Sequence, residues 1–132
     1  MLELMYITNS PEVASIADGA GVDRIFIDLE QYGKEKRQKN WDSVKSKHSI
    51  SDIPKVKSAV KNAQIFVRTD PIFDGFSDEL EGVLACEPDV VMLPYFKTVR
   101  EVETFIKAVD GRATTSLLLE TREAAEQIDD II

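Results

Sequence analysis

Two acidic residues stand two positions apart at the end of an apolar segment. The segment from Arg24 to Leu29 is rich in isoleucine and phenylalanine and is predicted to form a strand, with Glu30 directly after it. Successive strand side chains point to opposite sides, so Asp28 and Glu30 share one face. Two acids on the same face of a buried strand are costly unless another group compensates their charge. The sequence therefore predicts a polar site at this strand end, with a partner for the two carboxylates.

Other charged residues stand at the ends of later predicted strands. Arg68 closes the strand at Gln64–Arg68, Asp70 follows it, and Glu120 follows the strand at Thr114–Leu119. In a parallel barrel, the carboxyl ends of the strands converge on the face that holds the active site. One arginine among several acids favours an anionic substrate and a divalent cation. A guanidinium fits carboxylate or enolate oxygens, and glutamate is a ligand for hard metal ions.

Five strand–helix units are needed to position these residues. The strands are predicted at Leu2–Thr8, Arg24–Leu29, Gln64–Arg68, Val90–Leu93 and Thr114–Leu119. Continuously apolar strands of this kind are typical of parallel sheets covered on both faces. The predicted fold class is therefore α/β, either a doubly wound sheet or part of an eight-unit barrel. Neither a dinucleotide-binding glycine motif nor a P-loop follows the first strand, which disfavours nucleotide binding.

The helices between these strands are predicted from apolar residues at helical spacing. Ser10 caps the first helix, the second runs from about Ser51 to Asn62, the third begins at Ser77, and Thr98 and Glu101 form a capping box for the fourth. The residues expected to face inward are Val13, Ile16, Ala17 and Ala20, then Val56, Ala59 and Val60, then Leu80, Val83 and Leu84, then Val99, Val102, Ile106 and Val109, and, in a single last helix, Ala124, Ala125, Ile128 and Ile131.

Composition narrows the class of protein. The chain has 132 residues, of which 43% are hydrophobic and 30% charged, and its net charge is -8. These values predict one globular domain, and the negative charge disfavours nucleic acid or an anionic membrane as a partner. No apolar segment approaches the roughly 20 residues of a membrane span. Cys86 is the only cysteine, which fits a reducing compartment. We therefore expect a cytoplasmic protein.

Four motifs in the predicted order resemble the HpcH/HpaI aldolase and citrate lyase beta-subunit family. They are IDLEQ from Ile27, FVRTD from Phe66, MLPYFKT from Met92 and LLLETREA from Leu117. The resemblance implies a (β/α)8 barrel, of which residues 1–132 would form about five units as a single partial domain. It also implies cleavage or formation of a carbon–carbon bond through an enolate, with Mg²⁺ or Mn²⁺ as cofactor. The substrate would be a 2-oxo acid or an acyl-CoA ester.

The same resemblance assigns roles to the residues at the strand ends. Glu120 matches the glutamate that binds the metal. Arg68 matches the arginine that steadies the substrate oxygen, as a catalytic and substrate-binding residue. Glu30 matches the acid that organises the site and its metal-bound water, and Asp28 lies beside it as a substrate-binding residue.

This sequence departs from the family pattern at several positions. Gln31 replaces a histidine and cannot accept a proton at neutral pH, and Ala85 replaces the aspartate that supports that histidine. The family's second metal ligand follows a sixth strand, which is expected beyond residue 132. These departures favour an alternative in which a truncated barrel acts as a non-catalytic assembly or binding protein. An open sheet edge promotes association, so a homo-oligomer is expected, and a monomeric mass by light scattering would contradict it.

Each candidate also has a purely structural interpretation. Asp28 and Glu30 could be solvated at the start of a loop, and Arg68 could be only their salt-bridge partner. Glu120 could be an acid stabilised by the dipole of the helix that follows it. Asp70 precedes a proline, and we favour a turn role for it.

The sole histidine and a basic segment leave two further alternatives open. His48 is expected to serve at the surface or as a cap, although with Gln31 in the histidine position it is the remaining neutral-pH base. A basic loop is expected to be solvated, with contact to an anionic substrate tail as the alternative; its residues are Lys34, Lys36, Arg37 and Lys39.

Overall fold

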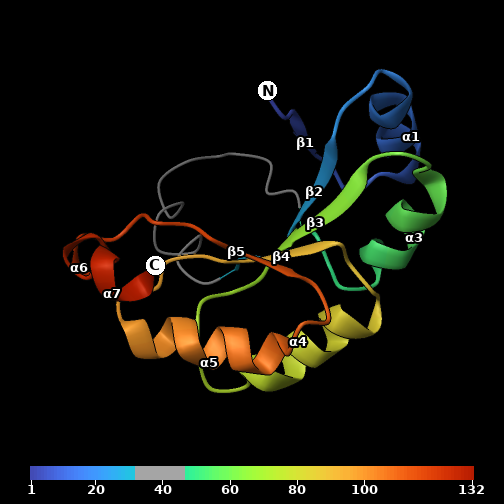
Figure 1. The fold of residues 1–132 in the computed structure, drawn as a ribbon. Coiled ribbons are helices and arrows are strands. Elements are labelled where there is room, and N and C mark those ends of the chain that lie inside the picture. The colour runs from blue at the N-terminus through green and yellow to red at the C-terminus, as the bar shows by residue number, and fades with distance from the viewer. Residues whose placement is uncertain (32–46) are drawn as a thin grey trace, which may run out of the picture.

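A computed structural model describes residues 1–31 and 47–132, which form one parallel sheet with helices between its strands. The strands follow chain order in the sheet and are β1 (Met5–Ile7), β2 (Arg24–Asp28), β3 (Gln64–Arg68), β4 (Val90–Leu93) and β5 (Thr114–Leu117). The helices are α1 (Pro11–Gly19), α3 (Asp52–Ala59), α4 (Phe76–Ala85), α5 (Val99–Val109), α6 (Arg122–Glu126) and α7 (Ile128–Ile131). Neighbours in sequence pair in the sheet throughout, so the expected partial α/β barrel is confirmed (Figure 1).

The main core lies between the sheet and the helices that follow one another around its outer face (Figure 1). Alternate strand residues enter this core because strand side chains alternate between faces. Those with almost no exposed surface are Ile25, Ile27, Ile65, Val67, Val91 and Leu93. The helix residues Leu80, Val83 and Leu84 pack against this layer, as the sequence predicted. The intervening strand residues therefore face the opposite, inner side of the sheet.

Aromatic residues form a second small cluster on that inner side. Phe26 and Phe66 are partners in the β2–β3 register, and their rings stack with centroids 5.0 Å apart. Val90 and Met92 extend the cluster onto β4. Two positions further along β2 and β3, the register aligns Asp28 with Arg68, so a polar pair lies directly beyond the aromatic pair.

The inner face of α1 differs from the predicted one. Val13 and Ile16 were expected to be buried, but they are 37% and 69% exposed, and Ala20 is exposed too. Ala17 is buried as predicted, together with Ala14. Small side chains allow α1 to approach its neighbours closely. Asp18 is also buried, because its carboxylate accepts hydrogen bonds from the backbone amides of residues 61–63. These hydrogen bonds lower the pKa of Asp18 and fix the chain where α3 ends, three residues earlier than predicted.

The last two helical segments also correct the sequence prediction. On α5 the buried residues are Val102, Phe105 and Val109, whereas Ile106 is 47% exposed. The capping box between Thr98 and Glu101 is present as expected. The predicted single last helix is divided into α6 and α7, because the backbone of residue 127 leaves the helical conformation. Of its expected inward residues, only Ala124 is buried.

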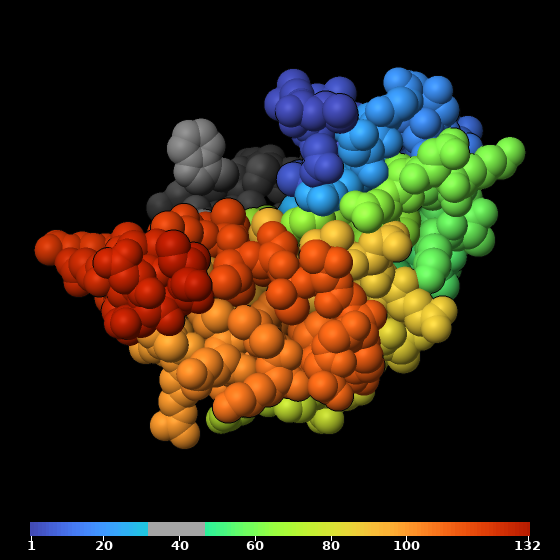
Figure 2. Space-filling model, in the orientation of Figure 1, coloured from blue at the N-terminus to red at the C-terminus, as the bar shows by residue number. Residues whose placement is uncertain are grey.

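The two edge strands are more exposed than the three central ones. All three residues of β1 are exposed, and β5 is exposed or half-buried, whereas β2, β3 and β4 are mostly buried. The edge strands are also shorter than predicted, because fewer of their residues pair with a neighbour. Figure 2 shows the N-terminal residues at one margin of the surface and α6 and α7 at another. Among the described residues, no helix has the length and apolar character needed to cross a membrane.

Candidate functional site

Arg68 and Asp28 form the centre of a polar site on the inner face of the sheet. They are the last residues of β3 and β2, and the parallel register places them side by side. Arg68 donates from Nε to Oδ1 of Asp28 at 2.9 Å and from Nη2 to Oδ2 at 2.7 Å. This two-point geometry is the strongest form of a guanidinium–carboxylate contact. The arginine head is therefore fixed in one orientation at the carboxyl end of the sheet.

Glu30 adds a second buried carboxylate to the same guanidinium. Its Oε2 lies 3.2 Å from Nε of Arg68, and the residue is only 4% exposed. The backbone amide of Glu30 also donates to Oδ1 of Asp28, which folds the chain back toward the strand end. The hydrogen bonds from Arg68 to Asp28, followed by the charges of Asp28, Glu30 and Glu120, raise the pKa of Arg68. The structural alternative of two solvated acids is therefore wrong for Asp28 and Glu30.

Arg68 also lies over an aromatic floor. Its guanidinium carbon is 5.5 Å from the ring centroid of Phe26, a distance at which a cation and an aromatic face attract each other. No described residue accepts a hydrogen bond from Nη1 of Arg68. This nitrogen is therefore the donor that remains available for an added oxygen.

Glu120 approaches the site from the end of β5. It is exposed, and the backbone amide of Tyr95 donates to its Oε1 at 3.0 Å. No described residue donates to Oε2. The charge of Glu120 contributes to the raised pKa of Arg68, although no hydrogen bond or ion pair joins the two side chains. Of the described parts of the chain, Asp28, Glu30 and Arg68 form one contact network, and Glu120 stands beside that network.

His48 supports the site from behind and is buried rather than at the surface. Its Nδ1 accepts a 2.9 Å hydrogen bond from the backbone amide of Asp28. A neutral imidazole has one acceptor nitrogen and one donor nitrogen. The acceptor of His48 is thus committed to the backbone, and in this arrangement the ring has no lone pair for a substrate proton. The expected surface position is wrong, and the N-cap of α3 is Ser51 rather than His48.

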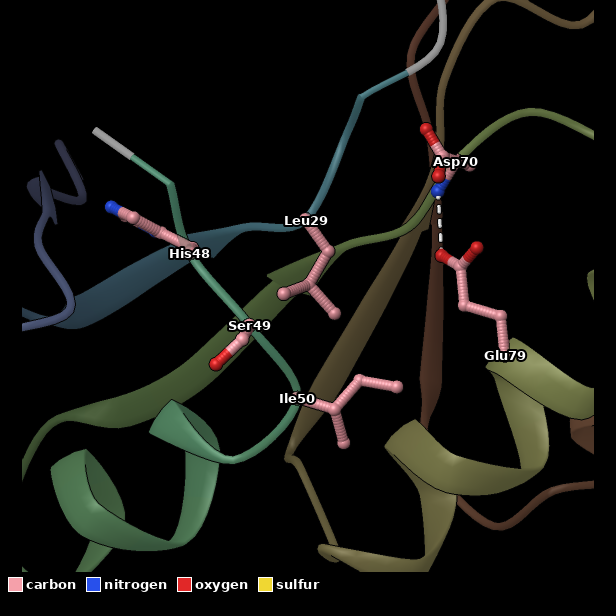
Figure 3. Close-up of a pocket in the computed structure, with 6 residues that line it drawn as sticks. All are labelled: Leu29, His48, Ser49, Ile50, Asp70 and Glu79. Atoms are coloured by element: carbon pink, nitrogen blue, oxygen red, sulfur yellow. Dashed lines mark hydrogen bonds between the residues drawn. The ribbon is translucent and has the colours of Figure 1, made fainter. Parts of the chain in front are cut away.

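A second acid pair lies on the helix side of the same strand ends. Asp70 donates its backbone amide to Oε1 of Glu79 at 2.9 Å, and its own Oδ1 accepts from the amide of Gln31 at 2.7 Å. Figure 3 shows the two acids across a small cavity from His48. The cavity has a volume of about 180 Å³. Burial, and then the charge of Asp70, raises the pKa of Glu79 to about 7.

Sequence reasoning missed three contributions to this region. His48 accepts a hydrogen bond from the backbone amide of Asp28, which is 20 residues away in the sequence, and no local sequence pattern predicts this contact. The sequence analysis did not single out Glu79, and the amide donor of Tyr95 has no sequence signal. Asp70 accepts a hydrogen bond from the backbone amide of Gln31, which is more than the turn role favoured from sequence. The basic residues Lys34, Lys36, Arg37 and Lys39 lie outside the described residues.

The donor set suits a hard divalent cation in part. Asp28 and Glu30 contact one guanidinium, and Glu120 stands beside them as a third carboxylate. Mg²⁺ is usually held by one or two carboxylates together with water and substrate oxygens. Among the described residues, none donates a hydrogen bond to Oε2 of Glu120. However, no group of three or more metal-binding side chains is assembled within residues 1–31 and 47–132.

The family of this chain follows from its sequence. A family model of the HpcH/HpaI aldolase/citrate lyase family matches residues 3–132, almost the whole chain. The chain belongs to this family. A comparison with curated protein sequences finds no match.

Solved structures of similar fold support this assignment at the level of architecture. An HpcH/HpaI aldolase from Desulfitobacterium hafniense DCB-2 is 12% identical with a TM-score of 0.67, over 98% of this chain and 57% of the aldolase. The citrate synthase SbnG is 15% identical with a TM-score of 0.71, over 98% of this chain and 56% of the synthase. A family protein from Burkholderia cenocepacia J2315 is 15% identical with a TM-score of 0.60, over 93% of this chain and 45% of that protein. The chain thus spans little more than half the length of the first two.

Proposed function

We propose that this chain provides the Arg68, Glu30 and Glu120 side of a metal-dependent carbon–carbon lyase site. The observation that carries the proposal is the pair of hydrogen bonds that Arg68 donates to Asp28, which fixes a guanidinium at the end of the sheet where Glu120 also lies. The substrate class is a 2-oxo acid or an acyl-CoA ester, and the reaction forms or cleaves a carbon–carbon bond through an enolate. Family membership supports a lyase-like activity.

Each protein group has a defined task in this proposal. Arg68 donates from Nη1 to the substrate oxygen that becomes negative in the enolate, because its other contacts hold the head in place. Preorganised donors of this kind stabilise a developing oxyanion without reorganising during the reaction. Asp28 holds the guanidinium, and Glu30 accepts from water bound in the site. Glu120 is the carboxylate that would hold Mg²⁺ or Mn²⁺. A bound ion of this type supplies Lewis-acid stabilisation of the same oxygen.

Proton transfer is the weakest part of the catalytic set. Gln31 stands where the family pattern has a histidine, and Nδ1 of His48 is occupied by the amide of Asp28. This observation favours a second candidate function, in which the chain keeps the scaffold and acts as a non-catalytic binding or assembly protein. Homo-oligomerisation would be compatible with either function. The open β1 edge supports it, since Leu4, Met5, Tyr6 and Ile7 are all about half exposed.

Divalent-metal binding distinguishes the two functions. We expect calorimetry to detect Mg²⁺ or Mn²⁺ binding by the wild-type chain, strengthened by pyruvate or oxalate because their oxygens complete the coordination. Glu120→Gln should abolish this binding, since an amide is a much poorer ligand for a hard cation. Glu123→Gln is the matched control, because it removes an equal charge three residues away on α6.

The outcomes separate the proposals. Binding that is lost in Glu120→Gln and kept in Glu123→Gln would support the lyase site, and aldol and CoA-ester substrates should then be screened for cleavage. Absence of binding at millimolar metal would overturn the proposed lyase function of this chain and favour the non-catalytic alternative. Equal binding by both variants would show that Glu120 is not the ligand.

A further inference from the structure

The backbone at Tyr95 adopts a conformation that bulky residues rarely take. Its φ is 50°, in the left-handed region, and it follows Pro94 at the end of β4. Such a conformation persists in a bulky residue only where the surrounding structure imposes it, and it is found preferentially at functional sites. The residue therefore needs an explanation beyond the turn that it makes.

The surroundings of Tyr95 fix the chain on both sides. Leu93 is fully buried on the helix side of the sheet, and Phe96 is only 2% exposed. The hydroxyl of Thr121 donates to the carbonyl of Phe96 at 2.6 Å, and the Gln127 side chain donates to the carbonyl of Lys97 at 2.9 Å. The segment between β4 and α5 is thus held by the segment after β5, which Figure 1 shows beside the start of α5. This anchoring leaves Tyr95 little freedom to relax.

The left-handed backbone gives the Tyr95 amide an unusual partner. Two other residues that are not glycine have positive φ in the described chain, Glu87 and Asp110. Both end helices, and their amides donate back to the helix they terminate, to the carbonyls of Leu84 and Ile106. By contrast, the amide of Tyr95 donates to a side chain from another strand–helix unit, at Oε1 of Glu120. A requirement to end a helix therefore explains the first two positions and not Tyr95.

We propose that Tyr95 is a positioning residue whose left-handed backbone fixes the carboxylate of Glu120. The amide holds Oε1 and leaves Oε2 as the oxygen that a ligand of the site can take. The consequence for metal binding rests on the proposed function, whereas the orientation of Glu120 does not. Residues that orient a metal ligand usually change metal affinity by 10-fold or more when they are altered.

Three substitutions test this role. Tyr95→Val places a β-branched residue where left-handed backbone is most costly, so the amide should leave Glu120. Tyr95→Gly keeps the amide and adopts the same φ without steric cost, so it should rescue the orientation. Asp110→Val is the matched control, because Asp110 has the same φ of 50° at the end of α5. Circular dichroism and urea denaturation identify any variant that fails to fold.

Two readouts are needed. The first is the rotamer distribution of the Glu120 side chain without metal, measured from NMR couplings. We expect a single rotamer in wild type, Tyr95→Gly and Asp110→Val, and averaging in Tyr95→Val. The second is Mn²⁺ affinity by calorimetry, which should fall about 10-fold in Tyr95→Val and stay within about 2-fold in the other two.

The results distinguish this inference from the proposed function. An unchanged Glu120 rotamer in folded Tyr95→Val would overturn the inference, whatever the metal does. If Tyr95→Val does not fold, two other results would overturn the inference. One is rotamer averaging of the Glu120 side chain in the wild type. The other is an NMR chemical shift of the Tyr95 amide proton that stays the same in Glu120→Gln. A wild-type chain that binds no Mn²⁺ would overturn the proposed function, and the rotamer measurement would still decide the role of Tyr95.

Discussion

Two pairs of acids lie beside the ends of β2 and β3, on opposite sides of the sheet. On the inner side, Asp28 and Glu30 are almost fully buried around the guanidinium of Arg68. On the helix side, Asp70 follows β3 and its backbone amide donates to Glu79 on α4. The pairs differ in the contact that joins them: a guanidinium bridges the inner acids, whereas a backbone amide links Asp70 to Glu79.

This difference decides the chemistry of each pair. Arg68 brings an opposite charge to two buried carboxylates, which offsets the cost of their burial. Burial, and then the charge of Asp70, raises the pKa of Glu79 to about 7, so Glu79 holds a proton near neutral pH. A guanidinium fixed by two carboxylates can orient a donor toward a substrate, whereas a carboxyl group with a raised pKa mainly responds to pH. The inner pair is therefore the one suited to the proposed chemistry.

The largest expected effect comes from removing the inner cation. Arg68→Met removes the guanidinium that pairs with two buried carboxylates, and breaking a buried pair in this way costs about 3 kcal/mol or more. We expect that loss in the free energy of unfolding by urea at pH 7.

A surface pair provides the control for this prediction. Arg112 also binds a carboxylate at two points, that of Glu81, but both side chains are well exposed. Arg112→Met should therefore be much less destabilising than Arg68→Met. Similar losses for the two variants would show that burial does not distinguish the inner pair.

An intermediate effect is expected where the inner pair is supported from behind. His48→Leu keeps most of the buried volume and removes the acceptor for the amide of Asp28. An unsatisfied buried amide costs about 1–3 kcal/mol, so we expect a loss of about 2 kcal/mol by urea denaturation. Ser49→Ala, at the exposed neighbouring position, is the control and should change little. An unchanged free energy of unfolding in His48→Leu would mean that the backbone amide of Asp28 finds another acceptor.

The smallest effect concerns Glu79 and depends on pH. The folded chain keeps the Glu79 proton up to pH about 7, whereas the unfolded chain releases it near the ordinary pKa of 4.5. Stability is therefore lost as the pH rises from 4.5 through 7. Glu79→Gln removes this loss and still offers an oxygen to the amide of Asp70. Because the position is half-buried, solvent screening reduces the expected gain to about 1 kcal/mol at pH 8.

The control and the contrary outcome for Glu79 are clear. The exposed variant Glu103→Gln on α5 should show no such pH-dependent gain. Equal stability of wild type and Glu79→Gln at both pH 5 and pH 8 would show that Glu79 ionises as in the unfolded chain. The contrast between the two acid pairs would then not hold.

Much of the architecture was predictable because it depends on local patterns. The five strands and their order were predicted, and β3 and β4 have the predicted bounds, because apolar periodicity and turn residues are read within a few positions. The capping box at Thr98 was predicted for the same reason. Helix faces were less predictable. Ile16 and Ile106 are apolar yet exposed, since the neighbouring helix decides which side of each helix is covered.

The sequence by itself determined the residue types at the strand ends and the family, because both are properties of the chain order. It placed Asp28, Glu30 and Arg68 at one edge of the sheet, and the structure brings these three into contact. Only the tertiary structure decided their partners. The contacts of His48 with Asp28 and of the Tyr95 amide with Glu120 join segments 20 and 25 residues apart, and the Asp70–Glu79 pair depends on how α4 packs beside the end of β3. The physical reason is that periodicity specifies which face a residue takes, whereas charge state and orientation depend on what packs against it.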